Sequence, residues 1–455
     1  MDAVTVSNVT RRNYARDEFL PETREQDVKL VQDVLAAVAQ NRPDQPRTII
    51  LRQEVGSGKT WFVYYLKREI LAKIPNVRTL LVSLSPTPPR EENKADEYLV
   101  PPEIYAPEAD AETLAKHLLE WVAQRIDPNG APQANLAEQT TWLRNKVAQE
   151  FKQETLVLIF DSLFELDWNK LPRLERALLA PLAAIPRVVL ILTGRGRIYS
   201  WESPLLRVNV VRFPAQPLRP FDEKEIQAQL DKQCREHPPE LSAQTILELG
   251  GGYPWVNYLL AQGATKKAAT QIAAEKLTEV IQDPEARARV RHDLEALSVL
   301  DGFTENEMQV LFAAYAKTPK PSKPEVRQRR DEILNTFLMH WRDGRFVIDE
   351  PMRRILENYL KYNEPQKWQQ LHCCAKQLYQ DWVKQFPDHT DAFTKRAKHH
   401  NEQLASAERE GMKITACQVD HSASHAASVI GRDSGALTDL VIQARRHELA
   451  GAMAE

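Results

Sequence analysis

The chain has 455 residues, of which 43% are hydrophobic and 27% charged, and its formal net charge at pH 7 is −3. These values are typical of a soluble globular protein with about two to four domains, and they exclude a general electrostatic attraction to nucleic acid. The sequence lacks the apolar run of a membrane span and, at its start, the apolar core of a secretory signal. Its four cysteines show no metal-ligand spacing, so we expect reduced thiols in a cytoplasmic protein without membrane contact.

Short apolar segments predict a parallel sheet, because strands that are buried on both faces have near-continuous apolar sequences. They cover residues 47–53, 77–86, 155–161, 187–194 and 208–213. Helical patterns lie between them, at 61–73, 111–126, 140–152 and 171–185. This alternation predicts an α/β P-loop NTPase domain over 48–215, with helices flanking the sheet. A lead-in helix is expected over 1–47.

After residue 215 the patterns are mainly helical. A lid domain of helices is expected over 216–285, with Asp222 as the cap of one of them. Residues 286–362 predict a winged helix, in which Asp343-Gly344 forms the turn of a hairpin. A helical hairpin follows over 363–412. The tail over 413–455 is of low complexity, and we expect it to be poorly ordered or docked on a partner.

A phosphate-binding loop is predicted between the first strand and the helix after it, which is the context that this motif requires. Glycines let backbone N–H groups approach phosphate, and the helix N-terminus adds positive potential. Lys59 would reach the β- and γ-phosphates and Thr60 would bind Mg²⁺. Gln53 replaces the first glycine of the motif, so the loop would start with altered geometry. A plain glycine-rich turn is the alternative. The nucleotide-binding set here is Val55, Gly56, Ser57, Gly58, Lys59, Thr60 and Trp61.

Two acids follow the strand over 155–161. Asp161 stands at its carboxyl end, where ligands bind in such sheets, and we expect it to hold Mg²⁺ through water. Glu165 could polarise the water that attacks the γ-phosphate. Ser162 stands where many related ATPases have their base, so Glu165 is the better candidate. The alternative is a solvated loop acid.

The strand over 187–194 ends in Thr193-Gly194-Arg195. Thr193 could bind the γ-phosphate by a hydrogen bond, and Arg195 could neutralise its charge. Arg197 is a weaker candidate, and the alternative is an arginine that closes a surface loop. Further on, Gly252-Tyr253-Pro254 predicts a rigid turn before a helix, which could equally be a plain connection between helices.

Taken in order, these motifs resemble those of the signal-transduction ATPases with numerous domains (STAND), in particular the NACHT and NB-ARC proteins. The resemblance covers about residues 19–360. The family's arginine-glutamate motif is matched at Arg24-Glu25, although Thr23 replaces its glycine. Its acidic motif D-[GAS]-h-D-E is matched at residues 161–165 except for Phe164, its T-[TSG]-R at 193–195, and its G-x-P at 252–254. The resemblance implies ATP or ADP with Mg²⁺ as cofactors, a nucleotide contact from Arg24, and an adenine pocket lined by Pro254.

Three departures from the family bear on the activity. Gln53 and Phe164 suggest slow hydrolysis. The winged helix has Asp349 where the family often has a histidine that holds the β-phosphate of ADP, and an aspartate would repel phosphate. No effector domain or repeat array is evident, so we expect a switch whose sensor or output comes from another protein or from the C-terminal helices.

Three functions compete. The favoured one is a slowly hydrolysing ATP switch for signalling or defence. Its protein partner or a second copy would bind the lid, the winged helix or the C-terminal helices. The second is an origin-recognition-like AAA+ ATPase that binds DNA through the winged helix, with the basic stretch 317–330 as its feature, although the prolines there favour a solvated loop. The third is a nucleotide-binding scaffold without hydrolysis.

Overall fold

The computed structural model describes residues 19–42, 45–53, 56–84, 97–99, 110–130, 132, 134–166, 170–195, 199–211, 218–234, 237–279, 281, 283–336 and 338–414. The chain divides into two compact units. The N-terminal unit comprises Met1–Leu247 and Gly252–Tyr258, and the C-terminal unit comprises Glu248–Gly251 and Leu259–Glu455. The predicted segment 415–455 of the tail lies outside the described residues.

The N-terminal unit is built on a parallel sheet with the strand order β3-β2-β4-β5-β1-β6. The strands are β1 Thr48–Arg52, β2 Val77–Ser83, β3 Glu97–Leu99, β4 Thr155–Asp161, β5 Val188–Gly194 and β6 Val210–Val211. Every residue of β4 and β5 is buried, as their apolar sequences predict. The five predicted strands are confirmed, while β3 was not predicted because three residues are too few to show a pattern.

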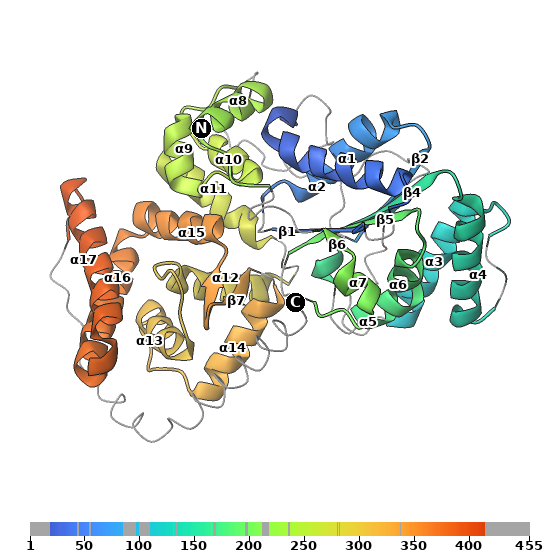
Figure 1. Ribbon diagram of the computed structural model, residues 1–455. Helices are drawn as coiled ribbons and strands as arrows, with labels where there is room; N and C mark the ends of the chain where they lie inside the picture. Colours follow the sequence, from blue (N-terminus) through green and yellow to red (C-terminus); the bar gives the residue numbers. More distant parts are fainter. Residues whose placement is uncertain are drawn as a thin grey trace. The chain divides into compact units, whose positions relative to one another are not determined.

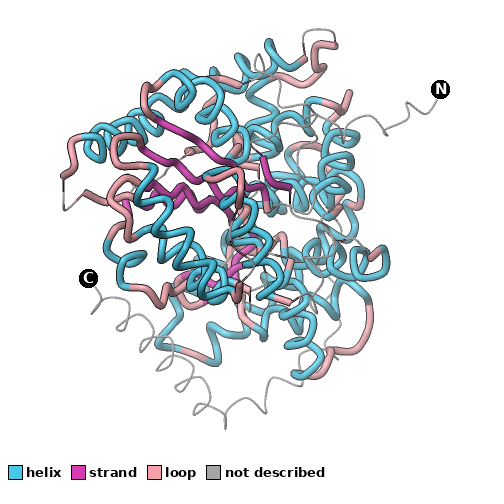
Figure 2. The backbone as a smooth tube through the Cα atoms, turned by 90° about the vertical axis from the view of Figure 1, so that its right-hand side faces the viewer, coloured by secondary structure: helices cyan, strands magenta, loops and turns pink. Residues whose placement is uncertain are grey.

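Helices cover both faces of this sheet (Figures 1 and 2). They are α1 Glu25–Ala39, α2 Lys59–Tyr65, α3 Ala111–Ile126, α4 Leu136–Glu150, α5 Leu171–Leu174, α6 Ala180–Ala183 and α7 Pro204–Val208. Because side chains alternate along a strand, Leu81, Ile159 and Ile191 pack with α1 and α2. Their neighbours Leu80, Leu158 and Leu190 pack with α3 and α4 instead. The predicted α/β class is confirmed.

The predicted helices of the sheet domain are observed with shifted ends. The pattern over 61–73 continues α2 through a π turn, Leu66–Ile70, and a 3-10 turn, Leu71–Lys73. The pattern over 171–185 contains α5, the π turn Glu175–Leu179 and α6. In both cases the helix changes its winding, which the period of the apolar residues does not reveal.

Three helices follow the sheet, α8 Glu223–Gln233, α9 Ala243–Gly250 and α10 Pro254–Ala261. Asp222 caps α8 as predicted, since its side chain accepts from the backbone N–H of Glu225 and the Glu225 side chain returns to the N–H of Asp222. Such a capping box satisfies two N–H groups that the helix itself cannot. Pro254 stands in the first turn of α10, where proline is favoured.

The C-terminal unit contains the predicted winged helix. The unit contains α11 Lys266–Thr278, which lies in the range predicted for the lid. The elements of the winged helix follow it: α12 Pro284–Leu297, α13 Glu305–Ala316, α14 Lys323–Asn335, β7 Met339–Arg342, β8 Arg345–Ile348 and α15 Glu350–Asn363. The antiparallel hairpin of β7 and β8 turns at Asp343 and Gly344, with φ of 50° and 77°. Two positive φ values are those of the turn that best fits the twist of a hairpin.

The basic stretch 317–330 is helical from Lys323 onward, so the solvated loop favoured by its prolines is wrong there. Ser322 is the cap of α14, and its hydroxyl accepts from the backbone N–H of Glu325. Pro324 stands in the first turn, where a missing N–H costs nothing. Proline therefore starts this helix rather than preventing it.

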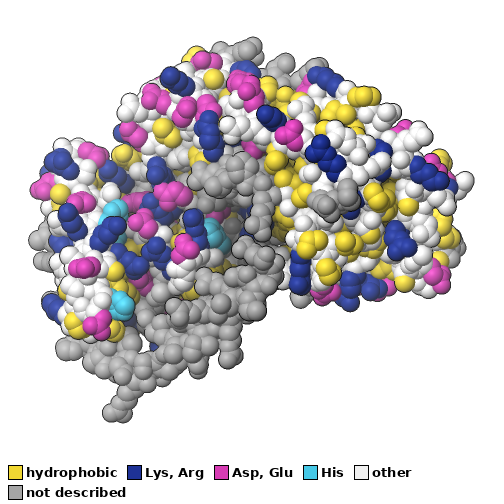
Figure 3. All heavy atoms as spheres, in the orientation of Figure 1, with side chains coloured by type: hydrophobic (Ala, Val, Ile, Leu, Met, Phe, Trp, Pro, Cys, Tyr) yellow, Lys and Arg dark blue, Asp and Glu magenta, His cyan; other side chains and the backbone are white. Residues whose placement is uncertain are grey.

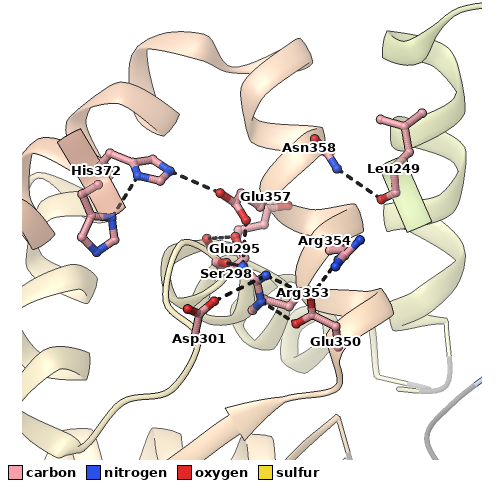
Figure 4. Close-up of polar contacts among 11 residues, drawn as sticks. Leu249, Glu295, Ser298, Asp301, Glu350, Arg353, Arg354, Glu357, Asn358 and His372 are labelled. Atoms are coloured by element: carbon pink, nitrogen blue, oxygen red, sulfur yellow. Dashed lines mark hydrogen bonds and ion pairs between the residues drawn. The ribbon is translucent and has the colours of Figure 1, made fainter. Parts of the chain in front are cut away.

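A network of charges on α15 holds the winged helix together (Figure 4). Arg353 is 8% exposed, and its guanidinium binds the carbonyl of Ser298 at 3.2 Å and the carboxylates of Glu350 and Glu357 at 2.9 and 2.8 Å. A buried charge is tolerated when it is paired in this way, and removal of one partner is costly.

The network continues into two long helices, α16 Pro365–Gln385 and α17 Thr390–Arg409, which form the predicted helical hairpin. His372 Nε2 lies 3.4 Å from Glu357 (Figure 4), and its Nδ1 lies 3.0 Å from Nδ1 of His400. Both rings are buried, with 0% and 2% exposed. Burial, aided by the neighbouring His372, His399 and Arg396, lowers the pKa of His400 to about 2.

We expect acid to destabilise this helical hairpin. His400 is neutral in the folded chain, whereas in the unfolded chain it binds a proton below its ordinary pKa of about 6.5. Its contribution is therefore fully present above about pH 6.5 and falls by about 1.4 kcal/mol per pH unit below it. The loss at pH 5 is about 2 kcal/mol, measured as the free energy of unfolding in urea. The His400→Phe variant should show a smaller loss.

An exposed histidine of the same helical hairpin supplies the control. His389 is solvent-exposed, so His389→Gln should leave the pH dependence of the parent unchanged. If the parent and His400→Phe lose equal stability between pH 7.5 and pH 5, the neutral state of His400 in the fold is contradicted.

Among the described residues, no helix combines the length and the hydropathy that a membrane span requires. Of the cysteines, Cys234 and Cys374 carry free thiols. The expectation of reduced thiols is wrong for Cys373, which is disulfide-bonded. Neighbouring residues of a helix point in different directions, so one of these two thiols can be bonded while the other is free.

Candidate functional site

The predicted phosphate loop joins β1 to α2, as its motif requires. Gly56 and Gly58 have φ of 78° and 90°, a left-handed conformation that glycine adopts without steric cost. Gln53 has no positive φ, so its side chain meets no such restriction. This explains why the first glycine of the motif can be absent. Val55 lies outside the described residues, and Trp61 is half-buried in the first turn of α2.

Lys59 is the first residue of α2 and is only 8% exposed. Its Nζ donates a hydrogen bond of 2.8 Å to the backbone carbonyl of Gln53. The ammonium group is therefore held across the loop, between its first and last residues. Inside the loop, Ser57 Oγ is fully buried and has no hydrogen-bond partner among the described residues.

Asp161 connects the loop to two strands. Thr60 Oγ1 donates to its carboxylate at 3.0 Å, and Thr193 Oγ1 donates to it at 2.7 Å. Thr193 also accepts from the backbone N–H of Ser162 at 3.1 Å. Burial raises the pKa of Asp161 to about 6, and the hydrogen bond from Thr193 opposes this rise. The one proton of the Thr193 hydroxyl thus serves Asp161, and its contact to a γ-phosphate stays a prediction.

Glu165 and Arg195 pair with each other. Their side chains are 15% and 12% exposed, and Arg195 Nε lies 3.5 Å from Glu165 Oε2. The predicted base and the predicted phosphate-binding arginine therefore neutralise one another in this arrangement. Arg197 lies outside the described residues.

Phe164 replaces the middle acid of the motif and belongs to the core, being 2% exposed. Its ring lies edge-on to Trp201 at 6.1 Å, and the Arg52 guanidinium stands 5.8 Å from the ring centre. A Cβ at Gly194 would lie 2.7 Å from the Phe164 nitrogen, which explains why the centre of Thr193-Gly194-Arg195 must be glycine.

Arg24 reaches the loop from the turn before α1. The residue is 3% exposed, and its guanidinium donates to the carbonyls of Ser57 at 3.3 Å and Arg219 at 3.0 Å. It also stands 5.0 Å from the centre of the Phe221 ring. Burial lowers its pKa to about 10, so it stays charged at neutral pH. Here the arginine holds the outside of the phosphate loop, and its predicted contact to nucleotide stays a prediction.

The turn Gly252-Tyr253-Pro254 lies beside the loop, within the N-terminal unit. A Cβ at Gly58 would lie 3.7 Å from Pro254, and the backbone N–H of Trp255 donates to the Gly56 carbonyl at 3.3 Å. Phe221 N–H donates to the Gly252 carbonyl at 2.8 Å. Trp255 is 38% exposed, which leaves part of a large aromatic surface open next to the glycines.

Asp349 has its own partner in the C-terminal unit. It is 4% exposed and lies 3.1 Å from His340 Nδ1 on β7. The acid that replaces the family's histidine is thus buried against the wing.

The structure thus brings together Lys59, Thr60, Asp161 and Thr193, with Arg24 and Pro254 at the loop. The chain has the fold of a P-loop nucleoside triphosphatase. Four further residues near the site were not predicted: Arg52, Ser83, Phe221 and Trp255. Ser83 could have been found by the rule that found Asp161, because it also ends a buried strand.

The donors present fit a nucleotide with Mg²⁺. Thr60 and Asp161 are the hard oxygen donors that Mg²⁺ prefers, and this ion usually keeps several waters besides. The hydroxyl of Ser57, which has no hydrogen-bond partner among the described residues, and the ammonium of Lys59 are both donors, and phosphate oxygens accept hydrogen bonds from such groups.

No protein-family model matches the sequence, and the search of curated proteins returns no match. Among solved structures, a Walker-type ATPase of Pyrococcus abyssi is 17% identical over 76% of this chain and 97% of that one, with a TM-score of 0.44. A STAND protein from Pyrococcus horikoshii with a tetratricopeptide repeat sensor is 13% identical over 83% of this chain and 55% of that one, with a TM-score of 0.31. The Aeropyrum pernix ORC1 protein in complex with DNA is 14% identical over 76% and 94%, with a TM-score of 0.36.

These likenesses are distant, and at such TM-scores they carry no argument about what the chain does. The fold follows from the strand order, the left-handed glycines and the contacts of Lys59 and Asp161.

Proposed function

We propose that the chain is a STAND-type molecular switch for signalling or defence that binds ATP with Mg²⁺ and hydrolyses it slowly. The observation that carries this proposal is the contact of Thr60 and Thr193 with the buried Asp161, beside the ammonium of Lys59. A structural turn would have no reason to gather a buried carboxylate and a lysine at the carboxyl edge of a parallel sheet, where ligands bind.

Each residue has a role in this proposal. Lys59 binds the β- and γ-phosphates, and the loop N–H groups from Gly56 to Thr60 complete the cradle. Thr60 and Asp161 hold Mg²⁺, which supplies compensation for the charge that develops on the phosphates. Glu165 accepts a proton from the attacking water.

Slow hydrolysis follows from the state of Glu165. Its carboxylate faces Arg195 at 3.5 Å, so a γ-phosphate competes with Glu165 for the guanidinium. Only when the phosphate takes Arg195 is the carboxylate released to orient water. Phe164 cannot assist, because its ring is packed in the core.

The switch rests on the segment Gly252–Tyr258. It contacts the phosphate loop through Trp255 and Gly56, and the helix that it starts, α10, begins in the N-terminal unit and ends in the C-terminal unit. A nucleotide that displaces this segment would therefore act directly on the connection between the units. About 5.5 kcal/mol of preference for one state shifts such an equilibrium from 1:99 to 99:1, which a few charge-assisted contacts of roughly 1.5–3 kcal/mol each can supply.

We expect the radius of gyration or the mass of the chain to differ between ADP and a non-hydrolysable ATP analogue. Small-angle scattering and sedimentation with Mg²⁺ measure both quantities. The Lys59→Ala variant should have the same radius of gyration and the same mass with either nucleotide. Identical shape and mass of the parent in both states, with nucleotide binding verified, would leave the third function, a static scaffold.

The charges of the winged helix argue against the DNA-binding alternative. The arginines of α14 are engaged by acids of the same unit, since Arg327 pairs with Glu305, Arg329 with Asp293 and Arg330 with Glu305. Positive and negative side chains are mixed over the visible face of α16 and α17 (Figure 3). These observations support a protein partner or a second copy over a phosphate backbone. Duplex binding whose log K falls steeply with log salt would instead favour the origin-recognition-like function.

The proposed ADP lock is weak. Asp349 is buried against His340, so this position offers no imidazole to a β-phosphate. ADP would then be retained by the phosphate loop alone, which lowers the barrier to exchange.

A further inference from the structure

Three neighbouring strands end in a row of polar side chains. Ser83 on β2 stands opposite Asp161 on β4, and the register of β4 with β5 makes Thr193 the next partner of Asp161. Two residues before them, Leu81, Ile159 and Ile191 face α1 and α2. Since side chains alternate, Ser83 shares the face of Asp161 and Thr193, on the side of the sheet where α2 begins at Lys59.

Among the described residues, Ser83 is the one member of this row whose side chain has no hydrogen-bond partner. It is 0% exposed, and its Oγ makes no hydrogen bond with the described residues. The carboxylate of Asp161 already accepts hydrogen bonds from the hydroxyls of Thr60 and Thr193. Its backbone carbonyl accepts from the N–H of Leu84 at 2.9 Å. A buried hydroxyl without a partner costs free energy, and such groups need an explanation, for which an absent water or ion is a common one.

We propose that Ser83 is a positioning residue for the Mg²⁺ that accompanies the nucleotide. Its hydroxyl, with one donor and two acceptor positions, binds a water of the ion beside Asp161 and fixes how that water is oriented. Mg²⁺ retains several waters in protein sites, and residues that orient the ligands of a metal commonly change its affinity by about 10–100-fold. This inference rests on the proposed nucleotide site.

The test measures Mg²⁺ and not turnover. The dissociation of a fluorescent ATP analogue from the full chain is followed at increasing Mg²⁺. In Ser83→Ala, the Mg²⁺ concentration that half-maximally slows dissociation should rise by about 10-fold or more, while analogue binding in EDTA stays as in the parent. Ser83→Thr retains a hydroxyl and should return most of the parental Mg²⁺ dependence.

A matched control lies at the opposite edge of the sheet. Thr155, at the amino end of β4, is also buried. Thr155→Val removes a hydroxyl that lies away from the phosphate loop, so the Mg²⁺ dependence should not change. Since Ser83 Oγ has no partner in the described part of the chain, Ser83→Ala should unfold at the parental urea concentration or above it. If the hydroxyl had a purely structural role, its removal would instead lower the urea concentration at the midpoint of unfolding.

The outcomes separate the two proposals. If the parent retains the analogue with Mg²⁺ and Ser83→Ala needs the same Mg²⁺ concentration, the role of Ser83 is refuted and the nucleotide site stands. If the parent does not bind the analogue at all, the proposed function fails, and the role of Ser83 fails with it.

Discussion

Replacement of Lys59 with alanine is expected to lower the affinity for ATP by at least about 100-fold. The lysine is the one residue of the loop that brings a full positive charge to the β- and γ-phosphates. Two charge-assisted contacts at about 1.5–3 kcal/mol each correspond to this loss or a greater one. Titration with a fluorescent ATP analogue or by calorimetry measures it directly.

The fold should survive this change. Lys59 Nζ contacts the backbone carbonyl of Gln53, and water can replace that contact once the side chain is shortened. Lys73 offers a matched control, because it ends the same helical segment with its side chain 67% exposed. Lys73→Ala should bind ATP like the parent. Parental affinity in Lys59→Ala, with circular dichroism unchanged, would refute the phosphate loop.

The Glu165→Gln variant is expected to retain ATP while its turnover falls by about 10²–10⁴-fold, the usual contribution of a positioned base. Glutamine keeps the size of the side chain but cannot accept the proton of water. It also removes the negative charge beside Arg195, so the guanidinium is free for the γ-phosphate. ATP should therefore be held as tightly as in the parent or more tightly.

Phosphate release and chromatography of the bound nucleotide measure both effects. Glu154→Gln, at an exposed position before β4, is the control for the loss of a charge and should hydrolyse ATP normally. If Glu165→Gln releases phosphate at the parental rate, the base is not Glu165, and a partner subunit becomes the next source to examine.

The sheet could be predicted because the sequences of its strands indicate burial on both faces. Each central strand is a run of apolar residues, and helical periods separate them. Very short elements and changes in the winding of a helix could not be predicted. β3 is three residues long, and the π turns after α2 and α5 have five residues each, too few to show a period of their own.

The loop and Asp161 could be predicted from the places of single residues at the ends of strands. The partners of the polar groups could not, because a sequence does not show where a side chain turns. Thr193 donates to Asp161, Arg24 binds backbone carbonyls, and Arg195 pairs with Glu165. Each of these three groups was predicted to contact the nucleotide, and each contacts protein in this structure.

The contact between Gly56 and Trp255 joins residues about 200 positions apart in the chain. At a synthesis rate of about 5–20 residues per second, the loop leaves the ribosome about 10–40 s before the segment that covers it. The strand β1 also stays unpaired during part of synthesis, because its partner β5 follows about 140 residues later. The growing chain thus carries a glycine-rich loop and an unpaired apolar strand for much of its synthesis, which makes this interval the one in which aggregation or a chaperone competes with folding.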